Sequence, residues 1–323
     1  MSFLETNKLY CGYSEELLPK IRPNSISLSF WSPPYFLGKE YEKELSYHDW
    51  QKMLKQVICA HFPIIKPGGF VVINIADIFS FKDENMPRIM GQNPQNRKCP
   101  VTKEMIERIM EKHPTYKRKK IAEILGCSEQ TVDRRLHGNN IRGGKYEVAT
   151  KVKITGGNLE KYAESAGFYL YDIRIWAKDP AWANSKWTTN TLKAVSEFEY
   201  LYIFWKPGEY VVNKSRLSSN EWREWGLRQI WHIPSVRKND IHQAMFPIPL
   251  ASRVIRLYSD PGETVLDPFV GSGTTAISAI RNNRNFIGID KEKAFIAVAN
   301  SRINDELRNP NLIGFQSPSI YPL

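Results

Sequence analysis

The feature that most constrains the fold is an apolar stretch that runs directly into a glycine-rich turn, at residues 264–275. The order of residue types predicts a buried strand, a turn that contains Gly271 and Gly273, and a helix that begins just after it. A second apolar strand is predicted at residues 286–289 and ends at Asp290. Glycines at such a turn let the backbone approach a ligand, and an acid after the next strand can accept hydrogen bonds from ribose hydroxyls. The stretch therefore predicts an α/β fold with a nucleotide-type cofactor site.

The residues around the glycines narrow the class of cofactor. No third glycine follows at dinucleotide spacing, and no Gly-Lys-Ser/Thr sequence indicates a phosphate-binding P-loop. Asp-Pro-Phe precedes the glycines at residues 267–269, and Thr274 and Thr275 follow them. In this form the stretch resembles the S-adenosylmethionine motif of amino-group DNA methyltransferases. A second signature of that family, Ser-Pro-Pro-Tyr, is present at residues 32–35.

The residue types of the Ser-Pro-Pro-Tyr sequence suit transfer of a methyl group to an amino nitrogen. That nitrogen is a weak nucleophile because its lone pair is conjugated with the ring. The Ser32 hydroxyl oxygen and the Pro33 carbonyl can accept its hydrogens and direct the lone pair at a sulfonium methyl. Pro34 has no N–H to compete, and the Tyr35 ring can stack on a base swung out of the helix. Without the glycine motif, a proline-rich strand end with an incidental serine would be the better explanation of this sequence.

The order of the motifs is similar to the β arrangement of these methyltransferases, with the catalytic sequence first and the cofactor glycines last. Serine at the first catalytic position resembles the branch that methylates N4 of cytosine. The resemblance implies a Rossmann-like methyltransferase sheet, S-adenosylmethionine as cofactor and direct transfer to a base flipped out of duplex DNA. It also implies a restriction-modification system with a separate restriction endonuclease. The residues that it assigns are Ser32, Pro33, Pro34 and Tyr35 for catalysis, and Asp267, Pro268, Phe269, Gly271, Ser272, Gly273, Thr274, Asp290 and Phe246 for the cofactor.

Two other functions stay open at this point. N6 of adenine presents a similar amino group, so an adenine methyltransferase is the first alternative. A DNA-binding regulator without catalysis is the second, because the family usually has Gly-Asp where this chain has Gly12-Tyr13. That acid contacts the adenine end of the cofactor, so either Ser14 or a main-chain group replaces it or the cofactor binds more weakly.

A basic helical insert is predicted at residues 81–145. Between residues 97 and 145 there are 13 Lys and Arg against 6 Asp and Glu, so +7 of the chain's +11 net charge lies there. Such a concentration of positive charge favours a polyanionic partner, here double-stranded DNA.

Residues 121–136 of the insert resemble a helix-turn-helix unit. Ala122 is small where two helices would cross, Gly126 supplies the turn, and Ser128 would cap the second helix. The alternative is an αα-hairpin with a solvated basic face. The side chains expected to contact DNA are Gln130, Arg134 and Arg135.

A second candidate DNA-reading region covers residues 207–240, where arginines and tryptophans alternate irregularly. Guanidinium groups form bidentate contacts with guanine and phosphate, which predicts DNA contacts for Arg223, Arg228 and Arg237. A flap whose tryptophans belong to the core is the equally weighted alternative. The predicted catalytic domain comprises residues 1–80, 146–206 and 241–323.

The remaining composition excludes several classes of protein. The four cysteines are far apart, so neither a zinc site nor a disulfide framework is expected, and no metal is predicted. No Pro-Cys pair supplies the thiolate that a ring-carbon methyltransferase needs. The N-terminus has no leader pattern and no window approaches the ~18 apolar residues of a membrane span, which predicts a cytoplasmic protein without a membrane partner.

Overall fold

An eight-stranded sheet forms the centre of the larger of two units. The larger unit contains residues 1–81, 152–181 and 196–323, and the smaller one contains residues 82–151 and 182–195. The computed structural model describes residues 2–34, 46–82, 89–91, 99–137, 146–148, 150–180, 194–236 and 245–308.

The strand order in the sheet is β1-β12-β11-β2-β3-β9-β8-β10. Neighbouring strands pair in parallel, except that β9 is antiparallel to both β3 and β8. The chain therefore confirms the predicted α/β fold. The strands are β1 Lys8–Cys11, β2 Ile26–Trp31, β3 Ile65–Ile75, β8 Tyr169–Ala177, β9 Phe198–Trp205, β10 Ile230–His232, β11 Thr264–Asp267 and β12 Asn285–Asp290.

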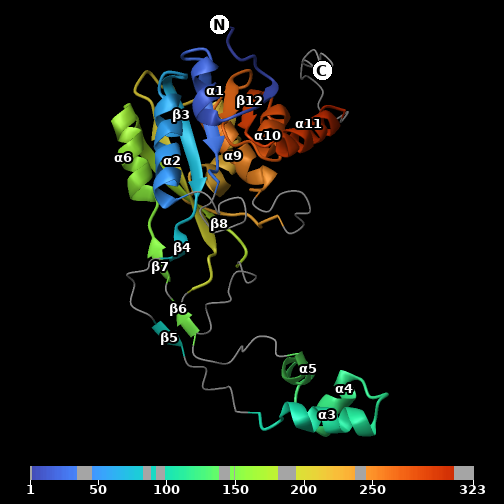
Figure 1. Ribbon diagram of the computed structural model, residues 1–323. Helices are drawn as coiled ribbons and strands as arrows, with labels where there is room; N and C mark the ends of the chain where they lie inside the picture. The colour runs from blue at the N-terminus through green and yellow to red at the C-terminus, as the bar shows by residue number, and fades with distance from the viewer. Residues whose placement is uncertain are drawn as a thin grey trace. The chain divides into compact units, whose positions relative to one another are not determined.

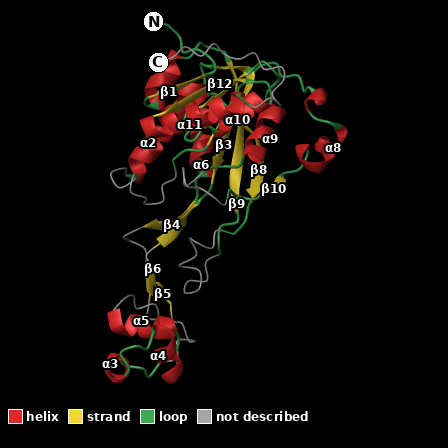
Figure 2. Cartoon of the chain, turned by 90° about the vertical axis from the view of Figure 1, so that its right-hand side faces the viewer, coloured by secondary structure: helices red, strands yellow, loops and turns green. Residues whose placement is uncertain are grey.

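Helices cover both faces of this sheet. Figures 1 and 2 show α9, α10 and α11 on the face opposite α2 and α6. Side chains alternate along β3, so that Phe70 and Val72 join the core under α9 and α10 while Val71 and Ile73 join the core under α2 and α6. The helices of this unit are α1 Ser14–Leu17, the 3₁₀ turn η1 Leu18–Lys20, α2 Tyr47–His61, α6 Gly156–Ala166, α9 Ile248–Tyr258, α10 Thr274–Arg281 and α11 Lys293–Leu307.

Strand β3 includes a sequence that favours a turn. Residues 66–69 are Lys-Pro-Gly-Gly, but β3 already starts at Ile65 and continues through Pro67, Gly68 and Gly69. Gly69 lies so close to the Ser27 carbonyl that a Cβ atom would stand 2.9 Å from its oxygen, so glycine permits the close pairing of β2 with β3 at this point.

Short elements complete the description of the chain. After β9 come η4 Lys214–Arg216, α8 Ser219–Glu221 and the π-helical turn η5 Trp222–Gly226. Two-stranded sheets join β4 Ile78–Lys82 with β7 Thr150–Lys153, and β5 Ile89–Gly91 with β6 Tyr146–Val148.

The described residues of the smaller unit include three helices, α3 Lys103–Lys112, α4 Arg118–Ile124 and α5 Glu129–His137. They bury a separate core of Val101, Ile106, Ile121, Ala122 and Val132. Among all the helices that the structure describes, none is long and apolar enough to cross a bilayer.

His61 at the end of α2 is fully buried beneath the sheet. Its Nδ1 lies 2.7 Å from the Val57 carbonyl, which can only accept, so Nδ1 carries the proton and Nε2 accepts from the Ser29 hydroxyl at 2.9 Å. The Trp31 ring stacks on the imidazole with 5.8 Å between centroids. Burial lowers the pKa of His61 to about 4, so the imidazole is neutral at neutral pH. In this form its hydrogen bond with Ser29 connects α2 to β2.

We predict that the pKa of His61 makes the unfolding free energy depend on pH. Because folding lowers this pKa from 6.5 to about 4, the unfolded chain binds the proton first. Stability should therefore fall as the pH drops from about 6.5 toward about 4, by up to about 3 kcal/mol. Urea unfolding of His61→Gln should show a flatter pH profile, while His48→Gln, on the exposed side of the same helix, should keep the profile of the parent. Parallel profiles for all three proteins would contradict this account.

Candidate active site

The two sequence motifs leave the sheet side by side. Strand β11 pairs in parallel with β2, and Val265 and Leu266 lie opposite Leu28 and Ser29. From β11 the chain crosses to β12 on one side, whereas from β2 it crosses to β3 on the other. Ligands of open α/β sheets bind at such a reversal, outside the carboxyl ends of the strands. The residues between β11 and α10, 268–273, are called the glycine loop below. This loop and the Ser-Pro-Pro-Tyr sequence both begin at that edge.

The glycine loop is held by backbone hydrogen bonds to β12. Gly271 and Gly273 have φ angles of 48° and 87°, a region that favours glycine. The Val270 amide donates to the Ile289 carbonyl at 2.8 Å, and the Gly271 amide donates to Asp290 Oδ2 at 2.9 Å. Asp290 thus stabilises the loop itself. Its contact with a ribose stays a prediction.

Asp267 ends β11 and is buried beneath the loop. Burial raises the pKa of its carboxyl to about 7, whereas hydrogen bonds from Thr275 and the Phe269 amide lower it and the charge of Asp290 raises it. The Phe269 amide donates to Asp267 Oδ1 at 2.9 Å. A ligand with a positive charge, such as a sulfonium, would favour the ionised form of this carboxyl. The loop therefore suits S-adenosylmethionine better than a phosphate group.

Ser32 follows β2 with its hydroxyl directed into the protein. Its Oγ is buried and forms no hydrogen bond with any residue that the structure describes, and the same holds for Trp31 Nε1 beside it. Buried polar atoms are rarely left without a partner, so these two mark a place where a polar ligand group can bind. Helix α2 holds Pro34 in place, because Trp50 Nε1 donates to the Pro34 carbonyl at 2.8 Å. Tyr35 lies outside the described residues.

Aromatic side chains of β2 pack against Phe269 of the glycine loop and against Phe246. The Trp31 ring lies 5.3 Å from that of Phe269, and the Phe30 ring lies 4.8 Å from that of Phe246, between centroids. Phe246 precedes α9 and packs on the core of the face that α9 and α10 cover. The structure thus brings three sequence-predicted stretches together around the ends of β2 and β11.

The position where the family usually has an acid is occupied differently here. The Gly12 amide donates to the Asp290 main-chain oxygen at 2.9 Å, while the Tyr13 side chain is 54% exposed. The Ser14 hydroxyl is buried and donates to the Pro268 carbonyl. Ser14 therefore contacts the cofactor loop.

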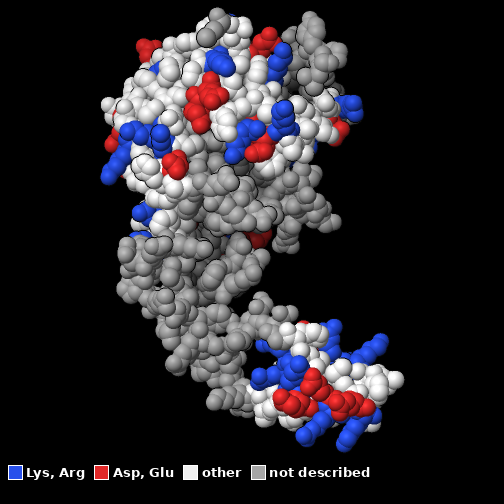
Figure 3. Space-filling view, viewed as in Figure 1, with Lys and Arg blue, Asp and Glu red and all other residues white. Residues whose placement is uncertain are grey.

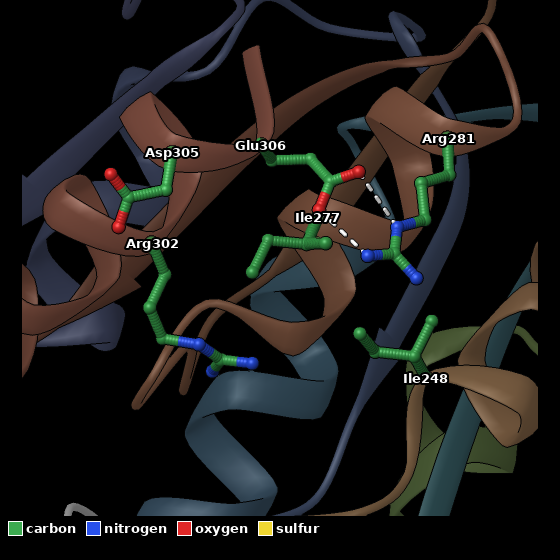
Figure 4. A pocket seen from close by; sticks show the side chains of 6 residues that line it. All are labelled: Ile248, Ile277, Arg281, Arg302, Asp305 and Glu306. Carbon is green, nitrogen blue, oxygen red and sulfur yellow. Dashed lines mark hydrogen bonds and ion pairs between the residues drawn. The ribbon is translucent and has the colours of Figure 1, made fainter. Parts of the chain in front are cut away.

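Two residues that the sequence analysis missed fix Ser272. Arg302 of α11 donates from Nη1 to the Ser272 carbonyl at 2.6 Å and approaches Met245 Sδ at 3.5 Å, and the Ser272 hydroxyl donates to the same sulfur. Figure 4 shows Arg302 extended away from the pair formed by Arg281 and Glu306. No pattern distinguishes Arg302 from other arginines of an amphipathic helix.

A cavity of about 260 Å³ adjoins this arginine. None of the predicted catalytic or cofactor residues lines it, so it is separate from the candidate active site. Its walls are Ile248, Ile277, Arg281, Arg302, Asp305 and Glu306 (Figure 4).

In the candidate target-recognition region the tryptophans belong to the core. Trp225 and Trp231 are 7% and 1% exposed, and Arg253 lies over both rings. Arg223 and Arg228 are exposed, as a DNA contact requires. Their side chains donate to Asn220 Oδ1 and to the Arg223 carbonyl, and these contacts do not test the predicted role. Arg237 lies outside the described residues.

The predicted DNA-contacting residues of the smaller unit lie on α5. Gln130 is exposed and Arg134 is half-buried. Arg135 is exposed and donates to the Cys99 carbonyl at 3.4 Å.

Comparison with known proteins places this arrangement among DNA-modifying enzymes. Residues 26–301 match the model of a family described as DNA methylase, of the N6/N4 type. The type II methyltransferase M.BglI of Bacillus subtilis is 54% identical over 302 residues, which cover 94% of this chain and 87% of the relative.

Solved structures share the fold. A putative DNA modification methylase of Thermus thermophilus, in complex with S-adenosyl-L-methionine, is 25% identical with a TM-score of 0.58 and 95% coverage of both chains. The cytosine-N4-specific PvuII DNA methyltransferase has a TM-score of 0.57 at 17% identity and covers 94% of this chain, with 92% of its own length matched. The second likeness concerns the fold alone.

We predict that Gly273→Ala weakens S-adenosylmethionine binding by on the order of tenfold, or about 1.4 kcal/mol. An alanine Cβ would lie 3.0 Å from that of Ala299 in a left-handed conformation, and the loop must move to relieve it. Gly262→Ala is a matched control, because its φ of 80° is equally left-handed but its Cβ meets nothing within 4 Å. Isothermal titration calorimetry should show weaker binding for Gly273→Ala alone. Equal affinities for the two variants would argue against this role of the loop.

Proposed function

Because the chain belongs to the N6/N4 DNA methylase family, we propose that this S-adenosylmethionine-dependent DNA methyltransferase methylates N4 of cytosine in duplex DNA. Ser-Pro-Pro-Tyr at residues 32–35 supports the choice of base, since it resembles the cytosine-N4 branch of the family. The similarity to M.BglI supports a type II restriction-modification system, with a restriction endonuclease that acts separately.

The observation that carries the proposal is the buried Ser32 hydroxyl at the end of β2, which has no hydrogen-bond partner among the described residues. It lies on the strand next to β11, from which the glycine loop departs. A cytosine flipped out of the duplex would donate one amino hydrogen to Ser32 Oγ and the other to the Pro33 carbonyl. The nitrogen would then direct its lone pair toward the cofactor methyl.

The chemical step needs no covalent enzyme–base adduct. The N4 nitrogen forms a bond to the methyl carbon as the carbon–sulfur bond breaks, and its electron pair stays on sulfur to give S-adenosylhomocysteine. The methylated nitrogen then loses one proton to solvent. In this proposal the chain contributes position and hydrogen bonding.

An adenine-N6 enzyme is the alternative that shares this site. The amino groups of adenine and cytosine have the same two hydrogens, and Ser32 Oγ can accept from either. Which of the two bases is methylated therefore has to be determined by experiment.

We predict that Ser32→Ala lowers the methylation rate by on the order of 10²-fold, with little change in cofactor affinity. Nucleoside mass spectrometry of DNA from a methylation-deficient host should detect N4-methylcytosine with the parent protein and with Ser278→Ala, and far less of it with Ser32→Ala. Ser278→Ala is a matched control, since it also removes a buried hydroxyl without a described partner, but from the interior of α10. Full methylation by Ser32→Ala would refute the catalytic assignment, and N6-methyladenine would overturn the choice of base while keeping the mechanism.

A further inference from the structure

The smaller unit has the geometry of a helix-turn-helix. Helices α4 and α5 are joined by four residues, 125–128. Gly126 adopts a φ of 60°, and the Cys127 amide donates to the Ala122 carbonyl at 2.9 Å, which closes the turn. Ser128 Oγ accepts from the Thr131 amide at 3.2 Å and so caps α5. Ala122 and Val132 meet in the core, with Leu136 packed against it.

Among the three described helices of this unit, the net positive charge lies on α4 and on the residue before it. Residues 103–112 of α3 hold three Lys or Arg and three Glu, so α3 is neutral. Residues 117–137 hold six Lys or Arg and three acids, a net charge of +3. Figure 3 shows Lys and Arg side chains around the rim of this unit and a strip of acids across the visible face. Glu104, Glu107 and Glu111 share one side of α3 by their spacing, so a polyanion would avoid that side.

Some of the positive charges are already neutralised and others are not. Arg118 pairs with Asp133 at 2.5 Å, and Lys120 pairs with Glu123 at 3.3 Å. Lys117 and Lys119 are exposed and form no ion pair within the part of the chain that the structure describes. These two lysines are available to an external anion.

The polar side chains at the start of α5 add a second kind of contact. Gln130 is exposed in the first turn, and Arg134 follows it by four residues, so both lie on the same side of the helix. In helix-turn-helix proteins the first residues of the second helix read base edges in the major groove. Glutamine forms paired hydrogen bonds with adenine and arginine with guanine.

We propose that α4 and α5 form a second DNA-binding surface, in which Gln130 and Arg134 contact base edges while Lys117 and Lys119 bind phosphates. The proposal rests on the assignment of this chain as a DNA methyltransferase. Its ligand is duplex DNA, either the methylated site with its flanks or a separate operator sequence.

The phosphate contacts are tested by the salt dependence of binding. Fluorescence anisotropy with the full chain and a mixed-sequence duplex of about 30 base pairs gives the slope of log affinity against log salt. Lys117→Ala/Lys119→Ala should reduce that slope by about 1.8, the value for two lost phosphate contacts. Lys103→Ala/Lys112→Ala removes the same charge from α3 and should change the slope by less than half as much. Equal effects of the two double variants would overturn the proposed surface.

The base contacts are tested by selection of bound duplexes from a random pool. Arg134→Ala and Gln130→Ala should each lose about 5- to 150-fold discrimination at one position of the selected sequence. A position inside the methylated site would assign the surface to target reading, and one in an unrelated sequence would assign it to an operator. Selected sequences identical to those of the parent would refute base contacts by α5.

Binding and methylation are separate readouts in this design. If the parent protein produced adenine-N6 instead of cytosine-N4 methylation, the salt slopes and selected sequences would be unaffected. If methylation matched the proposed function and the lysine variants bound like the parent, the second surface alone would fail. Far-UV circular dichroism of each variant excludes loss of the three-helix unit as the cause.

Discussion

The parallel pairing of β11 with β2 is the interaction on which the site depends. These strands come from opposite ends of the chain, yet Leu266 lies opposite Ser29 at the centre of the sheet. Each strand ends where a motif begins, so one register places the glycine loop and the Ser-Pro-Pro-Tyr sequence at the same edge. A one-residue slip would move every side chain of β2 to the other face and bury Ser32 in a different environment.

Around this pair, neighbouring elements restrict how the site can move. Asp290 and the Ile289 carbonyl hold the glycine loop from β12, and Arg302 holds it from α11. Trp50 Nε1 of α2 donates to the Pro34 carbonyl, so the Ser-Pro-Pro-Tyr sequence is held from the opposite face of the sheet. The groups left without partners are Trp31 Nε1 and Ser32 Oγ among the described residues of this region. Catalysis by positioning requires such a rigid frame around a group, here Ser32 Oγ, that is free to accept a hydrogen bond from the substrate.

Residues 264–275 predicted the strand, the turn and the helix because apolar patterning and glycine chemistry are local properties. The turn-closing role of Gly126 and the cap by Ser128 were predictable for the same reason. Arg302 was not, because its contact with Ser272 joins residues 30 positions apart and depends on how α11 packs. The start of β3 at Ile65 was not predictable from Pro67 and Gly68, because it depends on the pairing of Ile65 with Ile26 of β2, ahead of an irregularity in the register. In the region of residues 207–240, the number of tryptophans did not reveal that Trp225 and Trp231 are buried.

A crystal structure of the protein with S-adenosylmethionine would test the central claim most directly. If β11 and β2 form one site, the cofactor should lie over the Gly271–Gly273 turn, with its sulfonium methyl facing Ser32 Oγ and the Pro33 carbonyl. The space between the methyl carbon and Ser32 should accommodate one amino nitrogen. A cofactor bound at the glycine loop with its methyl directed away from the end of β2, or bound in the cavity beside Arg302, would contradict the account.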